Sequence, residues 1–166
     1  MRDALQKTEI PGITEPAHET EPHDAIHVRQ VTPGIRILQY SDAKVVMKPW
    51  GRERWLHEAE APYCFKVIRI SAGCRTSLQY HRHKQESNFL LEGEAVMHYR
   101  ETLDEPTQCI PMTAGTLVHV EAGSVHRIEA VTDIILVEVS TADDGSDTVR
   151  LGDDYQRRDG RVEAEH

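Results

Sequence analysis

The segment "GCRTSLQYHRHKQESNFLLEGE", residues 73–94, carries a glycine near each end. Gln79, His81 and His83 alternate along it, so in a β-strand all three side chains point to one face. Glu86 follows after two further polar residues and precedes an apolar run. Imidazole and carboxylate groups in this arrangement are typical metal ligands. The stretch therefore predicts two strands joined by a polar loop, with a candidate metal site where they meet.

Short strand signals continue on both sides of this stretch, at spacings of about 8–12 residues and with turn residues between them. Such a series, with almost no helical periodicity, predicts an all-β sandwich or barrel that encloses one ligand-sized cavity. The predicted strands span residues 34–40, 43–47, 63–70, 76–81, 87–93, 94–100, 116–123, 125–131 and 133–140.

The length of 166 residues suits one domain with a single core. Residues 1–27 are polar, acidic and interrupted by three prolines, so we expect a flexible arm there, a domain over 28–157 and a flexible tail over 158–166. No apolar run reaches the length of about 18 residues that spans a membrane. The N-terminus also lacks the basic-then-apolar pattern of a secretory signal. We therefore expect a cytoplasmic protein that does not bind a membrane.

The composition limits the partners of this protein. A net charge of −9 argues against a nucleic-acid binder, which needs a basic face, and an aromatic content of 5% argues against base stacking. A small anionic substrate held by local cations is compatible with this charge. The three cysteines, Cys64, Cys74 and Cys109, fit no zinc or redox spacing and are expected to be reduced thiols.

Two segments, residues 73–93 and 115–130, resemble the two sequence motifs of the cupin superfamily. The first segment matches throughout, except that Gln79 stands where the first histidine is usual. The second contains His126, with a glutamate and an alanine in place of the usual proline and asparagine. The resemblance implies a single-domain cupin, which is a double-stranded β-helix or jelly-roll barrel, with one divalent metal ion.

The ligand set has two alternatives. The cupin spacing selects Gln79, His81, Glu86 and His126, and leaves a four-residue loop before Glu86. The rival set replaces Gln79 by His83 and leaves only a lysine and a glutamine for the turn. A two-residue hairpin would need positive φ angles that these residues resist, so the first set is favoured. Either set suits Zn, Fe(II), Mn or Ni.

Five segments occur in a fixed order along the chain, and together they resemble the C-terminal cupin domain of type II phosphomannose isomerases. This family usually carries a histidine and an aromatic residue after the metal-binding glutamate, where this chain has Ser87 and Asn88. These departures bear on the identity of the substrate more than on metal binding. The segments are "KPWGRE" (48–53), "FKVIRI" (65–70), "SLQYHRHKQE" (77–86), "AGSVHRIE" (122–129) and "DTVRLGDDYQR" (147–157).

The resemblance implies a metal-dependent sugar-phosphate isomerase of the mannose 6-phosphate type. In such an enzyme the ion polarises the carbonyl of an open-chain sugar, and a base moves a proton between C1 and C2 through an enediol. Lys66, His83 and Arg127 are the candidate catalytic residues, as base, proton-transfer group or anion clamp. Arg69 and Asn88 are candidates for substrate binding, Asn88 because it shares a face with the metal-binding glutamate. The plain alternative is that the lysine, the histidine and the two arginines are surface residues.

Two further functions are open. One is an Fe(II) cupin dioxygenase that acts on a small polar metabolite, and the other is a non-catalytic cupin that binds a sugar or metabolite. Each has a small molecule as its partner. Cupin barrels commonly pair through their sheets, so we also expect a homodimer.

Three residues with chemically capable side chains are expected to have structural roles. His98 and His119 lie in predicted strands but match no motif. Trp50 is expected to pack in the core rather than to bind a sugar.

Overall fold

The computed structural model describes residues 26–142 and 146–155 of the chain. Within these ranges it contains thirteen strands, one short 3-10 helix (Tyr40–Asp42) and no α-helix, which confirms the predicted all-β class. The predicted tail over 158–166 and the arm over 1–27, apart from residues 26 and 27, lie outside the described residues. The strands are β1 (Val28–Thr32), β2 (Ile35–Leu38), β3 (Lys44–Lys48), β4 (Gly51–Trp55), β5 (Tyr63–Ile70), β6 (Leu78–His81), β7 (Glu86–Glu92), β8 (Glu94–Arg100), β9 (Gln108–Thr113), β10 (Leu117–Val120), β11 (Val125–Ala130), β12 (Ile134–Thr141) and β13 (Thr148–Gly152).

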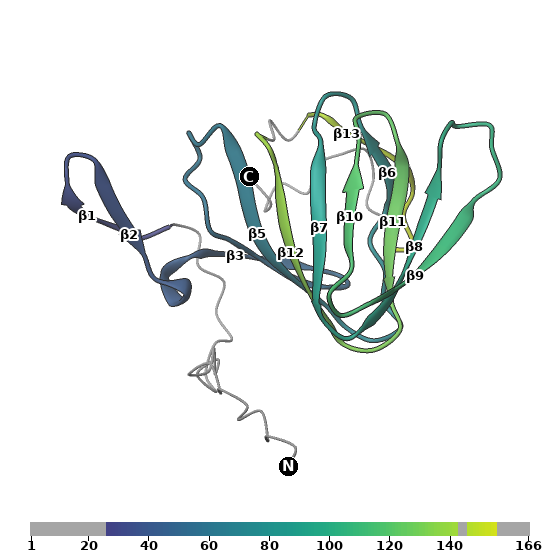
Figure 1. Ribbon diagram of the computed structural model, residues 1–166, viewed down its shortest axis with the longest axis horizontal. Coiled ribbons are helices and arrows are strands. Elements are labelled where there is room, and N and C mark those ends of the chain that lie inside the picture. Colours follow the sequence, from purple (N-terminus) through teal and green to yellow (C-terminus); the bar gives the residue numbers. More distant parts are fainter. Residues whose placement is uncertain (1–25, 143–145, 156–166) are drawn as a thin grey trace, which may run out of the picture.

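Two antiparallel sheets face each other across the core (Figure 1). One has six strands in the order β10-β7-β12-β5-β4-β3, and the other has five in the order β13-β6-β11-β8-β9. The chain crosses between the sheets after β5, β6, β7, β9, β10, β11 and β12, so each sheet joins strands that are distant in the sequence. This is the jelly-roll arrangement that the sequence predicts. Strands β1 and β2 form a separate hairpin that stands to the left in Figure 1.

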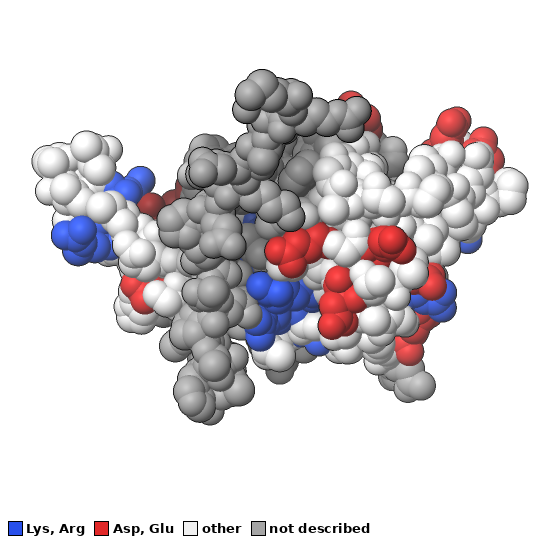
Figure 2. Space-filling model, turned by 60° about the horizontal axis from the view of Figure 1, so that its bottom comes forward, with Lys and Arg blue, Asp and Glu red and all other residues white. Residues whose placement is uncertain are grey.

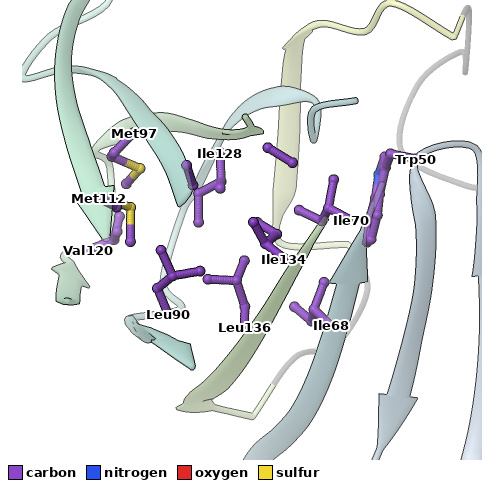
Figure 3. Packing of buried hydrophobic residues seen from close by; sticks show 12 residues of the cluster. Trp50, Ile68, Ile70, Leu90, Met97, Met112, Val120, Ile128, Ile134 and Leu136 are labelled. Carbon is purple, nitrogen blue, oxygen red and sulfur yellow. The ribbon is translucent and has the colours of Figure 1, made fainter. Parts of the chain in front are cut away.

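Side chains that point inward from both sheets form one apolar core. On β5, for example, Ile68 and Ile70 are buried, whereas Val67 and Arg69 on the other face are partly exposed, as strand alternation requires. Burying an aliphatic side chain of this size stabilises the fold by about 1.5–3 kcal/mol. Trp50 packs here too, as predicted. Figure 3 shows the cluster, which contains Trp50, Ile68, Ile70, Leu90, Ala95, Met97, Met112, Val120, Ile128, Ala130, Ile134 and Leu136.

The inward faces change from apolar to polar along the barrel. On β5 the inward series runs from Ile70 to Lys66, and on β12 it runs from Leu136 to Glu138. Because β5 and β12 are antiparallel, with Glu138 directly opposite Lys66, the two charged residues lie at the same end of the barrel. One end of the interior is therefore filled by apolar side chains, and the other carries ionisable groups.

The sequence did not predict strands β1, β4, β9 and β13, and their local patterns explain why. Strand β4, "GRERW", lacks an apolar face because its inward residue Glu53 faces the polar end of the interior and the residue that follows, Arg54, is buried although it is charged. The Arg54 guanidinium donates a hydrogen bond to the Tyr40 carbonyl oxygen at 2.6 Å. Strand β9 contains Pro111, which a sheet tolerates at its edge, and β9 is the last strand of its sheet. Tertiary contacts rather than local alternation define these strands.

The outer surface is mixed in character. On the face shown in Figure 2, basic side chains form small patches among acidic and uncharged ones. Several large apolar side chains are also exposed, among them Met47, Leu117 and Val139. In the part of the chain that the structure describes, no helix is long and apolar enough to cross a membrane.

We expect Gly93→Ala to destabilise the protein by more than about 2 kcal/mol, because two costs add at this position. Gly93 has a φ of 87° in the turn between β7 and β8, and a Cβ there would lie 2.4 Å from the Asp133 carbonyl oxygen. Gly73→Ala is the matched control, since Gly73 has a φ of 75° but, in the described part of the chain, no atom lies within 4 Å of its added Cβ. Equilibrium urea unfolding measures both, and an equal loss of stability in the two variants would contradict the steric argument.

Candidate metal centre

Two histidines and one glutamate converge at the polar end of the barrel. His81 ends β6, Glu86 begins β7 and His126 lies on β11, and all three are buried. Glu86 Oε2 lies 3.2 Å from His81 Nε2, and Glu86 Oε1 lies 3.1 Å from His126 Nε2. One ligand atom from each residue lies within 4.8 Å of the other two, which is close enough for all three to bind one ion.

The other ring nitrogen of each histidine is held by the protein. His126 Nδ1 lies 3.0 Å from the Ser124 carbonyl oxygen, which can only accept, so this nitrogen carries a proton. His81 Nδ1 lies 3.1 Å from Thr148 Oγ1, and the buried His81 Nε2, which faces Glu86 Oε2, makes no hydrogen bond to any of the described residues. Imidazole nitrogens that face a carboxylate in this way need a proton or a cation between them. The donor set and its outer hydrogen bonds therefore fit a divalent metal ion.

A proton on His126 competes with a metal ion for this position. Burial alone would raise the pKa of Glu86, but the Lys84 ammonium and the hydrogen bond with His126 hold that pKa well below its usual 4.5. Burial alone would lower the pKa of His126, yet the hydrogen bond and the negative charge of Glu86 raise it above its usual 6.5. A divalent ion has to displace such a proton, so its affinity decreases as the pH falls.

The loop between β6 and β7 has four residues, 82–85, as in the favoured register. The Asp147 carboxylate accepts hydrogen bonds from the backbone N–H groups of His83 and Lys84, at 2.9 and 2.8 Å. The His83 side chain is exposed and does not line the cavity that contains the cluster. The structure therefore does not bring His83 to the two buried histidines.

Gln79 does line that cavity. It lies directly opposite His126 on the neighbouring strand, and its Oε1 accepts a hydrogen bond from Ser77 Oγ at 2.6 Å. An amide oxygen is a donor of the kind that divalent ions accept. The structure thus brings together the four residues of the cupin spacing.

A buried lysine reaches the cluster from the loop. The Lys84 ammonium lies 2.8 Å from Glu86 Oε2 and 2.9 Å from Glu138 Oε1, and its side chain is only 4% exposed. Asn88, predicted to line the pocket, is buried there and donates a hydrogen bond to Glu86 Oε1 at 2.9 Å. Both oxygens of Glu86 therefore have partners that keep this carboxylate turned toward the histidines.

Lys66 points into the cavity, on the inner face of β5. Its ammonium lies 3.9 Å from Glu53 Oε2, 3.9 Å from Glu138 Oε1 and 4.7 Å from the centre of the Trp55 ring. Lys48 Nζ lies 3.8 Å from the other oxygen of Glu53. Burial alone would raise the pKa of Glu53, but the charges of Lys48 and Lys66 lower it. Basic and acidic side chains thus alternate along this wall.

The two predicted anion-binding arginines lie outside the cavity. Arg127 points outward from β11, where its Nε donates to the Thr76 carbonyl oxygen at 3.1 Å and its Nη2 lies 3.4 Å from Asp154 Oδ2. Arg69 lines a separate surface pocket with Asp133 on the outer side of the six-stranded sheet. Strand neighbours of inward residues face outward, so neither arginine reaches the metal ligands.

The cluster lies in a cavity of about 120 Å³ between the two sheets. This volume is below the range of about 300–1,000 Å³ that is typical of sites for drug-sized molecules, so it favours a small ligand. Among the described residues of its wall, four basic side chains outnumber three acidic ones, although the whole chain has a net charge of −9. The cavity therefore suits a small anionic molecule. The charged lining residues, apart from the histidines, are Lys48, Lys66, Lys84, Arg150, Glu53, Glu86 and Glu138.

The sequence analysis missed Lys84, Glu138 and Arg150. Lys84 lies in a loop, where alternation gives no information on the direction of a side chain. Glu138 did carry a usable signal, because it is the single charged residue in the run "IILVEVS", residues 134–140, and such residues are rarely buried without a partner. Arg150 lies opposite Gln79 on β13, which has no clear strand pattern.

Comparison with solved structures identifies the fold. CapF, the capsular polysaccharide assembling protein of Staphylococcus aureus, superposes with a TM-score of 0.59 and 18% identity, over 70% of this chain and 34% of that one. Oxalate decarboxylase of Bacillus subtilis has a TM-score of 0.57 and 18% identity, over 68% of this chain and 31% of that one. Oxalate decarboxylase of Lactobacillus farciminis, in a formate complex, has a TM-score of 0.56 and 14% identity, over 69% of this chain and 35% of that one. These identities show the cupin fold alone, and this chain spans about a third of each relative. No curated protein matches the sequence.

The sequence also matches a protein-family model. The model described as "Mannose-6-phosphate isomerase C-terminal" matches residues 38–153, well over half of the 166 residues. This range contains all four residues of the cupin spacing and every charged residue of the cavity wall. The resemblance seen in the five ordered segments is thereby confirmed. The chain belongs to the family of mannose-6-phosphate isomerase C-terminal domains.

Proposed function

We propose that this chain is a metal-dependent aldose–ketose isomerase that acts on a small sugar phosphate. One observation carries the proposal: the buried histidine–glutamate cluster opens into the same cavity as Lys48, Lys66, Lys84 and Arg150. A candidate Lewis-acid site and cations that can neutralise a phosphate are thus combined in one small space. The family to which the chain belongs supports the same class of substrate.

In this proposal His81, Glu86 and His126 hold one divalent ion, with Gln79 as the fourth donor. A bound ion would polarise the carbonyl of an open-chain sugar and make the neighbouring C–H proton easier to remove. Asn88 and Lys84 hold the Glu86 carboxylate in place, and Asn88 does so through its hydrogen bond to Glu86 Oε1. The ligands are buried, which keeps bulk water away from the reacting carbons.

The proton that moves between C1 and C2 needs a base in the cavity. Lys66 is the first candidate. Its ammonium lies 3.9 Å from the carboxylates of both Glu53 and Glu138, so it can pass its proton to one of them, and the neutral amine then acts as the base. The base removes the proton from C2 of the aldose to give the enediol, a proton passes from O2 to O1, and the base returns its proton to C1 to give the ketose. No oxidant or second substrate is needed for this balance.

A second candidate function is an Fe(II) dioxygenase. Two histidines with one carboxylate are the donor set of many non-haem iron oxygenases, and the cluster consists of that set. Such enzymes keep several positions open for substrate and oxygen, whereas Gln79 offers a fourth donor from the protein. We rank the isomerase first because of this fourth donor and the cations of the cavity.

Exchange of a substrate proton with solvent tests the isomerase. Protein loaded separately with Zn, Mn, Fe(II) or Ni is incubated in deuterium oxide with sugar phosphates from trioses to hexoses, including mannose 6-phosphate. We expect deuterium at C2, seen by NMR, because the base exchanges its proton with solvent before returning it. Lys66→Met should slow the exchange by about 100-fold or more and leave the metal content unchanged. His83→Ala is the matched control and should keep full exchange.

Two outcomes would overturn the isomerase. Consumption of oxygen by the iron-loaded protein, with no exchange in any sugar phosphate, would favour the dioxygenase. Saturable binding of a sugar phosphate to the metal-loaded protein, without turnover of any substrate, would show a non-catalytic metabolite-binding cupin.

A further inference from the structure

A second group of reactive side chains lies on the outer face of the five-stranded sheet, away from the cavity. Cys109 on β9 is paired directly with His98 on β8, and Glu129 lies on the adjacent strand β11. All three point outward, since Met97 on β8, Met112 on β9 and Ile128 on β11 are buried in the core and lie on the opposite face of their strands. The three side chains therefore form a row across three neighbouring strands, near the open edge of the sheet.

Two short contacts connect the three side chains, with His98 in the middle. Cys109 Sγ lies 3.2 Å from His98 Nδ1, and His98 Nε2 lies 2.9 Å from Glu129 Oε2. A carboxylate only accepts hydrogen bonds, so Nε2 carries the proton and Nδ1 is left to accept the proton of the thiol. Arg75 Nη1, 3.6 Å from Glu129 Oε2, helps to hold the carboxylate in place. A thiol, a base within reach and a third group that orients the base are the parts of an activated nucleophile.

Exposure separates Cys109 from the other two cysteines. All three thiols are free in the structure. Cys64 is buried and Cys74 is half-buried, whereas Cys109 is exposed. Of these thiols, only Cys109 combines access for a molecule in solution with the histidine–carboxylate pair described above.

We propose that Cys109 is a reactive thiol that exchanges with low-molecular-weight disulfides, with His98 as its base and Glu129 as a positioning residue. His98 Nδ1 takes the thiol proton while Cys109 Sγ attacks one sulfur of the disulfide. The disulfide bond breaks as the new bond to Cys109 forms. The second sulfur leaves as a thiolate and takes the proton back from His98. One disulfide is consumed, one mixed disulfide is formed and one thiol is released, so the incoming disulfide is the only oxidant required.

The rate of thiol modification in the folded chain tests this assignment. With excess dithiobis-nitrobenzoate, release of the coloured thiolate should show one fast-reacting thiol per chain, absent from Cys109→Ser. His98→Gln should slow this phase by roughly tenfold to a hundredfold, because the base is lost. Glu129→Gln should slow it by a smaller factor, and Glu129→Asp should restore part of the rate. His119→Gln is the matched control, since His119 is an exposed histidine that contacts Ser87 on the other sheet.

Two results would contradict the proposal, and a second pair of variants covers the case in which a variant unfolds. A fast phase that persists in Cys109→Ser, or an unchanged rate in His98→Gln, would overturn it. A variant that unfolds identifies itself by rapid reaction of all three cysteines. If His98→Gln unfolds, the modification rates of Glu129→Gln and Glu129→Asp are compared instead. Equal rates in these two variants would overturn the role of the histidine–carboxylate pair. Incubation with oxidised glutathione and mass mapping should place the mixed disulfide on Cys109.

Discussion

Replacing His126 or His81 by alanine is expected to remove the divalent ion, of which we expect about one per chain in the wild-type protein. Each histidine presents its Nε2 to Glu86, at 3.1 and 3.2 Å. Loss of an outer-shell partner of a metal ligand typically costs about 10–100-fold in affinity, and loss of the ligand itself should cost more. Elemental analysis after dialysis, with a chelator competition titration, measures both the stoichiometry and the affinity.

The matched controls for this prediction come from the same segment of the chain. His83→Ala should retain the ion, because the His83 side chain is exposed and outside the cavity. Gln79→Ala should lower the affinity by roughly tenfold, since two imidazoles and the carboxylate stay in place. Stoichiometric metal in both His81→Ala and His126→Ala would disprove the site. A larger loss in His83→Ala than in Gln79→Ala would establish the rival ligand set.

Replacing Lys84 by methionine is expected to destabilise the metal-free protein by about 3–5 kcal/mol at neutral pH. The ammonium lies within 2.9 Å of oxygens from two buried carboxylates, Glu86 and Glu138. Methionine fills a similar volume but leaves both carboxylates without this cation in a largely desolvated space. Urea unfolding in the presence of a chelator measures the loss. Arg82→Met is the control, because Arg82 is exposed in the same loop and its replacement should change stability by less than about 0.5 kcal/mol.

The pH dependence of this loss gives a separate check. The pKa of Glu86 lies well below its usual 4.5 in the folded protein, so Glu86 stabilises the fold above pH 4.5 and loses this effect as the pH falls further. Lys84 is the largest cause that lowers this pKa, so Lys84→Met removes part of that stabilisation. The difference in stability between wild type and variant should therefore be largest near neutral pH and decrease below about pH 4.5. A difference that stays constant across this range would show that lost packing, rather than charge, causes the destabilisation.

Several features could be predicted from the sequence because they depend on neighbours along the chain. The alternation in "YCFKVIRI", residues 63–70, identifies a strand with one inward face, and β5 spans these residues. The spacing of Gln79, His81 and Glu86 depends on two short strands and the loop between them, so it could be read without any distant contact. Ordered short segments likewise sufficed to identify the family.

The direction of a loop side chain and the charge of the cavity depended on tertiary structure. Lys84 turns inward because Asp147, more than sixty residues away, holds the loop backbone through two hydrogen bonds. Arg127 was expected near the substrate because it follows His126, yet strand alternation turns it to the outer face. The direction of Lys84 does not follow from the spacing of neighbouring residues, whereas the direction of Arg127 follows from the alternation of β11 next to the inward His126.

Both groups of reactive residues also depend on tertiary structure, because each joins side chains from three different strands. The metal cluster joins β6 and β7 to β11, and the Cys109–His98–Glu129 row joins β9 and β8 to β11. The all-β class, the first ligand motif and the family could be predicted from the sequence, because periodicity and short spacing are local properties of a strand. Which charged residues share the cavity, and which histidine meets a cysteine, depends on the fold, because sheet pairing joins residues that are far apart in the chain and packing of the whole barrel sets their registers.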